Sequence, residues 1–375
     1  MDRIVTDSAL RLADVEAHAT GPQATEPHRG RYRVFSTSGS LGLRGLFVLA
    51  PDEWTTWVAL HLRIFARIGL TPGMRLAPIG APGATHLTPQ LFATFRSGRA
   101  GAPRVSVLTP LPEIVDALNA YQPGALLGYP SVAGLLAEEQ LAGRLRIAPR
   151  LAMFGAEPTT VDLRCRLQAA RGLQPGNIYG TTEVPTVASS TPEHPDALEV
   201  IDDAVVVEVV DEHDRPVPPG VPGAKVLVTT LLNRAQPLIR YELSDRVTVA
   251  HGANPAGRPY LCLERIEGRA ADPLRLRARD GGEVAVMPYR LGEPVARTPG
   301  VSQFQIVWDG TRMEARLVVG RSSPRDVAGA LQANLSEALV AGGAVPPPID
   351  VCVVDALERE PGPAAKLKLI KATRR

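Results

Sequence analysis

The sequence predicts an α/β protein with a large N-terminal domain and a small α+β C-terminal domain. Over roughly the first half of the 375 residues, short apolar runs alternate with helix-like segments, which is typical of a largely parallel sheet layered with helices. After about residue 198 the chain becomes rich in valine and is interrupted by Pro/Gly turns, which predicts a β-subdomain at about 198–265. The pattern of the sequence changes again near residue 270, where strand-like and helix-like segments follow each other in a short α+β unit. We therefore expect an N-terminal domain over 1–270 and a C-terminal domain over 271–375.

A long amphipathic helix is predicted over 51–70, "PDEWTTWVALHLRIFARIGL". Pro51 and Asp52 are typical of a helix start, and Gly69 is typical of a stop. Its apolar side chains recur at helical spacing together with one histidine: Trp54, Trp57, Val58, His61, Ile64, Phe65 and Ile68.

The rest of the N-terminal domain reads as alternating strands and helices. Apolar runs predict strands within 74–81, 104–111, 150–157 and 176–180. Helix-like segments lie between them, at 111–121, 131–143 and 159–172. In the C-terminal domain we expect a hairpin over 304–320, a helix over 323–343 that opens at Ser323 or Pro324, and a strand within 349–357.

Composition excludes several classes of protein. The 41 basic residues are balanced by 39 acidic ones, and this net charge of +2 argues against a nucleic-acid binder. The three cysteines have neither a zinc spacing nor the pattern of a disulfide framework, which favours a reducing compartment. The N-terminus has no apolar core of a signal peptide, and no later run has membrane-spanning length. We expect a cytoplasmic protein without a membrane or nucleic-acid partner.

The stretch "FSTSGSLGLRGLF", residues 35–47, is rich in glycine and hydroxyl side chains. Glycine is costly in a helix and the run is too irregular for a strand, so we expect a loop whose backbone approaches a ligand closely. Backbone N–H groups and hydroxyls in such a loop suit a phosphate. Ser/Gly loops are common, however, and a surface turn is the plain alternative for this stretch taken alone.

Further motifs follow in a fixed order along the chain. They are "MFGAEPTT" (153–160), "IYGTTEVP" (178–185), "PLIRYELSDRVTV" (237–249), "IEGRAADPLRL" (266–276) and "PAAKLKLIK" (363–371). Together with the glycine-rich stretch, they resemble the successive core motifs of the adenylate-forming superfamily of acyl-CoA synthetases, adenylation domains and luciferases. With "PGALLGYPSVAGLLAEEQLAG" (123–143), the chain looks most like the phenylacetate–CoA ligase branch, from about residue 31 onward.

The resemblance implies a large adenylate-forming domain, a small mobile C-terminal domain and a reaction in two halves. A carboxylate attacks the α-phosphate of ATP to give an acyl-adenylate and pyrophosphate, and a nucleophile then displaces AMP. Magnesium would assist, and CoA or the phosphopantetheine of a carrier protein would be the acceptor. The substrate would be a small carboxylic acid, with aromatic acids among the candidates.

The resemblance also assigns site residues. The loop around the β- and γ-phosphates would comprise Thr37, Ser38, Gly39, Ser40 and Gly42. The adenine pocket would comprise Gly155, Ala156, Glu157 and Pro158 with the aromatic Tyr179. Gly180 follows Tyr179, Thr181 or Thr182 would reach the α-phosphate, and Glu183 would hold Mg²⁺. Asp245 would bind the ribose hydroxyls with Arg269 nearby, Asp272 would be the hinge, and Lys366 would act in adenylation.

The chain departs from the family pattern at several positions. Leu41 and Leu43 stand where the family usually has threonine and lysine, and Arg44 follows as a substitute cation whose guanidinium can bridge phosphate oxygens. Ala365 replaces the usual glycine before the C-terminal lysine. Only about 35 residues precede the phosphate loop, so part of the N-terminal subdomain is expected to be reduced or absent.

The acyl pocket is expected at residues 80–92, with His86 facing the substrate and Gly128 and Tyr129 contributing. A lone histidine is more often structural, which is the alternative for His86. Three functions stay open: an acid–thiol ligase of biosynthesis, an amide synthetase that uses an amine acceptor, and a degenerate nucleotide-binding protein. Glu183, Asp245 and Lys366 argue against the last, because a protein that only binds nucleotide has no need of them.

Overall fold

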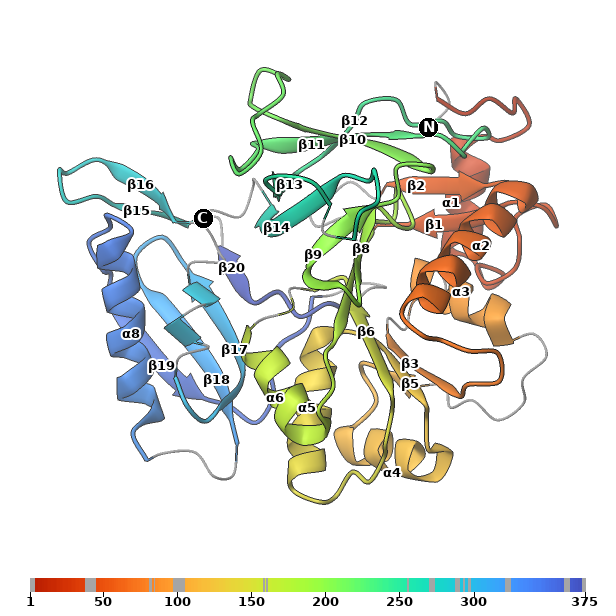
Figure 1. Cartoon of the computed structure of the whole chain (residues 1–375). Helices are drawn as coiled ribbons and strands as arrows, with labels where there is room; N and C mark the ends of the chain where they lie inside the picture. Colours follow the sequence, from red (N-terminus) through yellow and green to blue (C-terminus); the bar gives the residue numbers. More distant parts are fainter. Residues whose placement is uncertain are drawn as a thin grey trace.

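The fold is described from a computed structural model (Figure 1). The structure describes residues 4–37, 45–80, 83, 85–96, 105–157, 159, 161–254, 256–269, 274–286, 291–292, 294–295, 298–320, 325–360 and 365–372.

A nine-stranded sheet forms the centre of the N-terminal part, in the order β13-β14-β9-β8-β7-β6-β5-β3-β4. Its strands are β3 (Leu76–Gly80), β4 (Val105–Ser106), β5 (Ala125–Gly128), β6 (Leu151–Gly155), β7 (Gly176–Tyr179), β8 (Ala188–Thr191), β9 (His194–Val200), β13 (Asp245–Val249) and β14 (Cys262–Arg269). Strands β3 to β7 pair in parallel, whereas β8, β9, β14 and β13 continue the sheet in antiparallel pairing. The parallel half is the layered arrangement that the alternating apolar pattern predicts.

Helices cover both faces of the parallel half. They are α2 (Pro51–Arg67), α3 (Leu87–Arg96), α4 (Leu111–Tyr121), α5 (Pro130–Leu141) and α6 (Val161–Arg171). Along β5, Leu126 packs in one apolar cluster with α4 and α5, whereas its neighbour Leu127 packs in another with α2. Successive strand side chains point to opposite faces, so these runs are apolar throughout because both faces are buried.

The N-terminal segment contains elements that the sequence did not predict. Helix α1 (Leu12–Thr20) packs against a hairpin of β1 (Arg33–Ser36) and β2 (Leu46–Leu49). The expectation that the whole stretch 35–47 is irregular is wrong at its ends, because Phe35 pairs with Phe47 and Ser36 with Leu46. The predicted strand within 104–111 is also shorter than expected, since β4 keeps only two residues.

The valine-rich segment divides between two sheets. Strands β10 (Val205–Val210), β11 (Lys225–Thr230) and β12 (Tyr241–Leu243) form a separate antiparallel sheet, whereas β9, β13 and β14 extend the central one. The expected boundaries of the β-subdomain stay a prediction.

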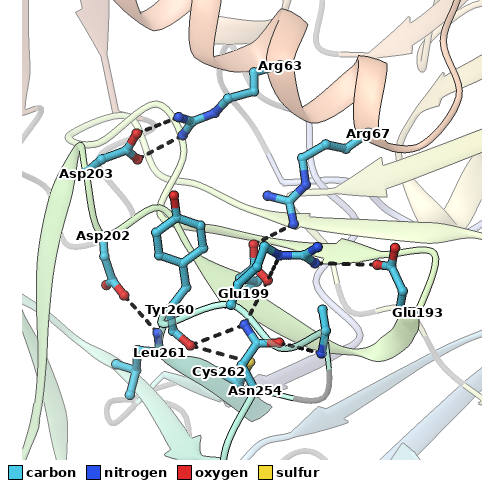
Figure 2. Close-up of polar contacts among 12 residues, drawn as sticks. Arg63, Arg67, Glu193, Glu199, Asp202, Asp203, Asn254, Tyr260, Leu261 and Cys262 are labelled. Carbon is cyan, nitrogen blue, oxygen red and sulfur yellow. Dashed lines mark hydrogen bonds and ion pairs between the residues drawn. The ribbon is translucent and has the colours of Figure 1, made fainter.

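A buried carboxylate joins helix α2 to strand β9 (Figure 2). Glu199 is 4% exposed and accepts hydrogen bonds from Arg67, Arg258 and Asn254, the last two at 2.8 Å. Burial opposes its ionisation, but these donors hold the pKa of Glu199 below its usual value. Nearby, Arg63 pairs with Asp203. Polar side chains of α2 therefore pair with residues in and after the antiparallel strand β9, whereas its apolar side chains pack in the core.

The C-terminal part has its own hydrophobic core, formed by residues between Leu274 and Ile370. A four-stranded sheet runs in the order β19-β18-β17-β20, with β17 (Val301–Trp308), β18 (Met313–Val319), β19 (Ile349–Val353) and β20 (Ile370–Ala372). Helix α8 (Val327–Ala341) covers it, and β15 (Leu274–Arg277) pairs with β16 (Glu283–Val286). Figure 1 shows this part lying beside α5 and α6, and contacts between α5 and β17 join the two parts. The predicted α/β class with a smaller α+β unit is confirmed.

Among the described residues, no helix combines the length and the apolar character that crossing a membrane requires.

Candidate active site

A cavity of about 120 Å³ opens where the parallel strands end. Gly128 is the last residue of β5, Gly155 is the last of β6, and Gly180 follows β7 directly, and all three line it. In open α/β sheets the carboxyl ends of the strands are the usual ligand-binding edge. The site is therefore built from main chain at the strand ends and closed by side chains from helices.

All three of these glycines leave no room for a side chain. A Cβ on Gly128 would lie 2.0 Å from the carbonyl oxygen of Ile79, one on Gly180 would lie 2.4 Å from that of Pro185, and one on Gly155 would lie 2.6 Å from that of Ile178. These approaches are far shorter than any real contact, so the positions need glycine for packing of the main chain around the cavity. Tyr129, which follows Gly128, is 2% exposed, and burial followed by the charge of Glu157 raises the pKa of its phenol, which stays protonated.

The structure brings the following predicted residues together around this cavity: His86, Gly128, Tyr129, Gly155, Ala156, Gly180, Thr181, Thr182 and Lys366. They come from separate motifs that the sequence places up to 280 residues apart, from His86 to Lys366.

His86 is buried and neutral. Burial lowers its pKa to about 3, and the positive charge of Lys366 adds to the effect. The backbone N–H of Thr88 donates to Nδ1 of His86 at 3.3 Å, so Nδ1 is an acceptor and the ring proton sits on Nε2. A neutral imidazole with Nε2–H beside an ammonium group offers two donors to an anionic ligand.

Lys366 reaches the cavity from the C-terminal segment. Its side chain is half-buried and lines the cavity together with Thr181 and Thr182. Lys368, two residues on, does not line it, and its carbonyl accepts a hydrogen bond from Gln305 at 3.0 Å. The structure therefore distinguishes Lys366, which lines the cavity, from Lys368, which does not.

The turn after β7 is held by its own hydrogen bonds. The hydroxyl of Thr181 accepts from the N–H of Val184 at 3.1 Å, and the N–H of Thr181 donates to the carbonyl of Val184 at 2.9 Å. Glu183 lies in this turn, half-buried, and its charge adds to burial in raising the pKa of Tyr241. No group of three or more metal-ligating side chains occurs among the residues that the structure describes. One carboxylate fits Mg²⁺ only if nucleotide phosphates supply other ligands, which is how this ion is commonly held.

Tyr179 and Asp245 meet directly. The hydroxyl of Tyr179 donates to Oδ2 of Asp245 at 3.0 Å, across 66 residues of sequence. Neither lines the cavity, and Asp245 opens β13 at the far edge of the central sheet. The backbone of Arg269 pairs with Asp245 at the end of β14.

The base of the glycine-rich loop is closed by Thr37. Its hydroxyl accepts from the N–H of Gly45 at 2.7 Å, and its own N–H donates to the carbonyl of Gly45 at 2.9 Å. One residue before, Ser36 hydrogen-bonds Thr85, its hydroxyl at 2.7 Å from that of Thr85, so the loop begins next to His86. Ser38, Gly39, Ser40, Gly42 and Arg44 lie outside the described residues, as do Pro158 and Asp272.

Glu157 does not line this cavity, unlike Ala156 before it. Its carboxylate accepts from backbone N–H groups of Ser131 and Leu367 instead. The expectation that residues 155–158 form the loop of the adenine pocket stays a prediction.

Apolar side chains form one wall of the cavity together with His61. Three of them, Leu87, Leu91 and Phe92, fall within residues 80–92, where the acyl pocket is expected. No site role was expected for the others, which are Phe65, Leu127, Met153 and Ile178. The helical spacing of His61 and Phe65 was visible, but α3 was not predicted. His61 is neutral: Nδ1 donates to the carbonyl of Trp57, Nε2 accepts from Thr186, both at 2.7 Å, and burial lowers its pKa to about 4.

Comparison with known proteins agrees with this architecture. Residues 84–229 match the AMP-binding enzyme family. The chain is 30% identical to the phenylacetate-coenzyme A ligase of Thermus thermophilus over 302 residues, covering 78% of this chain and 66% of that protein. It is 29% identical to the enzyme of the same name from Escherichia coli, covering 71% of this chain and 60% of that protein.

Solved structures share the fold. The crystal structure of 2-hydroxyisobutyryl-CoA ligase in its postadenylation state with 2-HIB-AMP has a TM-score of 0.76 at 21% identity, covering 100% of this chain and 81% of that chain. The same enzyme with 2-HIB-AMP and CoA in the thioesterification state has a TM-score of 0.58, covering 95% and 78%.

The chain thus belongs to the adenylate-forming superfamily. It spans 60 to 66% of the length of the curated phenylacetate-coenzyme A ligases that it matches.

Proposed function

We propose that this chain activates a small carboxylic acid with ATP and transfers the acyl group to the thiol of CoA. The observation that carries the proposal is the cavity at the strand ends, where Lys366 and a neutral His86 meet the threonines after β7. In the first half-reaction a carboxylate oxygen bonds to the α-phosphorus of ATP and pyrophosphate leaves. In the second, the thiol attacks the acyl carbon, AMP leaves, and the thiol proton passes to solvent or a base.

Each polar group has a role in the first half-reaction. The ammonium of Lys366 offsets the charge of two anions brought together, which is electrostatic stabilisation of the transition state. Nε2–H of His86 donates to the substrate carboxylate, and the hydroxyls of Thr181 and Thr182 bind the α-phosphate. Mg²⁺ would be held by Glu183 and supplies charge neutralisation at the phosphates. Thr37 belongs to the phosphate loop, Tyr179 packs against adenine, and Asp245 accepts from the ribose, with Arg269 beside it.

The substrate body would lie against apolar side chains. Phe65, Leu91, Phe92 and Met153 line the cavity, and this lining suits a small acid with an apolar or aromatic body. The names of the phenylacetate-coenzyme A ligases support an aromatic acid as the first to test.

Acid-dependent exchange of labelled pyrophosphate into ATP tests the first half-reaction. A panel of aromatic, branched and hydroxylated acids should contain at least one that supports exchange, and exchange should require Mg²⁺. Glu183→Gln keeps the shape of the side chain but loses its charge, so exchange should fall steeply at an unchanged melting temperature. Tight binding of ATP without exchange for any acid would favour a nucleotide-binding protein instead.

The acceptor is tested separately with the best acid. The acid is incubated with CoA, with a phosphopantetheinylated carrier protein or with an amine, in three separate reactions. We expect an acyl-CoA to form in the reaction with CoA. Formation of the amide alone would favour an amide synthetase, and acylation of the carrier alone would move the proposal to carrier-protein chemistry.

A further inference from the structure

A polar cluster joins the two parts of the molecule next to Lys366 in the sequence, through the residues on either side of it. Its centre is Glu157, which follows β6 in the N-terminal part and whose side chain is 3% exposed. Oε2 of Glu157 accepts from the N–H of Ser131 in the first turn of α5 at 3.0 Å. Oε1 accepts from the N–H of Leu367 in the C-terminal segment at 2.6 Å. One buried carboxylate thus bridges the two parts.

Arg359 adds a second bridge. Its guanidinium lies 3.5 Å from Oε1 of Glu157 and donates to the hydroxyl of Ser131 at 3.1 Å, both in the N-terminal part. It also donates to the carbonyl of Ala365 at 3.0 Å. With a side chain that is only 15% exposed, Arg359 supplies the positive charge that a buried carboxylate requires.

These contacts fix the main chain on both sides of Lys366. Arg359 binds the carbonyl of the residue before it, Glu157 binds the N–H of the residue after it, and the N–H of Glu360 donates to the carbonyl of Lys366 itself at 2.8 Å. Ala365 is 3% exposed and packs with Tyr129 of the N-terminal core. The backbone of Ala365 has φ of +44°, a conformation that alanine adopts only when its surroundings hold it there.

We propose that Glu157 is a positioning residue: it latches the C-terminal part in the orientation that directs Lys366 into the cavity. The latch acts on adenylation and not on acyl transfer, since it acts through Lys366; this consequence rests on the function proposed above. The chain also superposes better on the postadenylation state than on the thioesterification state of 2-hydroxyisobutyryl-CoA ligase, as the two TM-scores of 0.76 and 0.58 record. Such a latch acts only on the population of one orientation. Its loss therefore lowers the fraction of molecules that are arranged to form the acyl-adenylate.

The chain carries two natural labelling sites for a direct test. Cys165 on α6 and Cys352 on β19 are exposed and lie in different parts, whereas Cys262 is buried. Spin labels on the two exposed cysteines report the distance between the parts by pulsed electron resonance without any substrate. Wild type should give one dominant distance, and Glu157→Gln should give a broader distribution with a second population.

A matched control lies in the same C-terminal segment. Glu358 is paired with Lys371 and Arg316, and both partners belong to the C-terminal part. Glu358→Gln removes the same charge without touching the bridge and should keep the wild-type distance. A Glu157→Gln distribution equal to that of wild type, or a wild type that is already broad, would overturn the latch.

Half-reactions separate the latch from a structural effect. Glu157→Gln should lower the single-turnover rate of acyl-adenylate formation about tenfold and leave transfer from a preformed adenylate within about twofold of wild type, as a change in orientation predicts. Equal losses in both steps would contradict a positioning role. The distance measurement needs no turnover, so it tests the latch even if no acid proves to be a substrate.

Discussion

At the scale of single residues, the contact between Tyr179 and Asp245 joins two motifs that are each weak evidence for a nucleotide site when taken alone. A tyrosine at the end of a short strand and an aspartate at the start of another have ordinary structural roles in most proteins. Here the fold joins them by a hydrogen bond of 3.0 Å. Both motifs can be recognised in the sequence from their order along the chain. The contact between the two side chains could not be predicted, because it depends on the order of strands in the sheet.

Replacing Asp245 by alanine should weaken nucleotide binding by about 1–3 kcal/mol, the cost of losing hydrogen bonds to a charged acceptor. Calorimetric titration with Mg·ATP measures the change. Tyr179→Phe removes the hydroxyl that donates to Asp245 but keeps the ring, and should cost less. An affinity that Asp245→Ala leaves unchanged would exclude this carboxylate from the nucleotide site.

The two buried histidines predict how stability depends on pH. The folded pKa values of about 4 for His61 and about 3 for His86 lie below the usual 6.5, so folding favours the neutral ring. Their stabilisation is complete above pH 6.5 and is lost as the pH falls toward those folded values. Each should remove about 1.4 kcal/mol from the free energy of unfolding per pH unit in that window.

Urea unfolding between pH 7 and pH 5 tests this slope. His61→Gln should make the slope shallower, because glutamine takes up no proton in this pH range. Equal slopes for wild type and His61→Gln would show that His61 is not held neutral by the fold.

At the scale of elements, the sequence predicted most of the central architecture. The helix predicted over 111–121 is α4 (Leu111–Tyr121), and the predicted strands within 74–81, 150–157 and 176–180 all form. These elements have strong periodicity or a continuous apolar run between turn residues. Helix α3 was missed because Pro89 and the glycines and proline before it resemble a loop, although proline is tolerated in the first turn of a helix.

The walls of the site could be predicted only in part. Leu91 and Phe92 lie within residues 80–92, where the acyl pocket is expected, but their place on a helix was not predicted. Met153 and Leu127 face the cavity only because of the direction in which their strands present them. Glu157 sits in a recognisable motif, yet its partners come from α5 and from a segment about 200 residues away. Such contacts follow from tertiary packing and leave no local pattern.

The strand ends also make a prediction about packing. Gly128→Ala should cost more than 3 kcal/mol of unfolding free energy, because its Cβ would meet the carbonyl of Ile79 at 2.0 Å, a clash with main chain that cannot move freely. Gly143→Ala is the control for a positive φ without a clash: its φ is +73°, against +157° for Gly128, and nothing lies within 4 Å of the added carbon. It should cost about 1 kcal/mol. Chemical denaturation of both variants gives the comparison, and similar losses at the two positions would refute the close approach.

At the scale of the whole molecule, the C-terminal part has a hydrophobic core of its own. That core contains only residues from Leu274 onward, and the described bridges to the rest include those of Glu157, Arg359 and Gln303. Boundaries between domains of one chain resemble transient interfaces, so we expect that the C-terminal part can change its orientation. The hinge expected at Asp272 and the division at residues 270 and 271 remain predictions, because 270–273 lie outside the described residues.

In the proposed mechanism, Lys366 from the C-terminal part stabilises the transition state of acyl-adenylate formation. Single-turnover kinetics of the two half-reactions, on Lys366→Ala beside Lys368→Ala, measure this role. Lys366→Ala should slow formation of the acyl-adenylate by about 10²-fold or more, the effect of losing one transition-state contact. It should transfer a preformed acyl-adenylate to CoA at the wild-type rate, and Lys368→Ala should be normal in both steps. A selective loss in Lys368→Ala instead, or adenylate formation at the wild-type rate in Lys366→Ala, would show that Lys366 does not have this role.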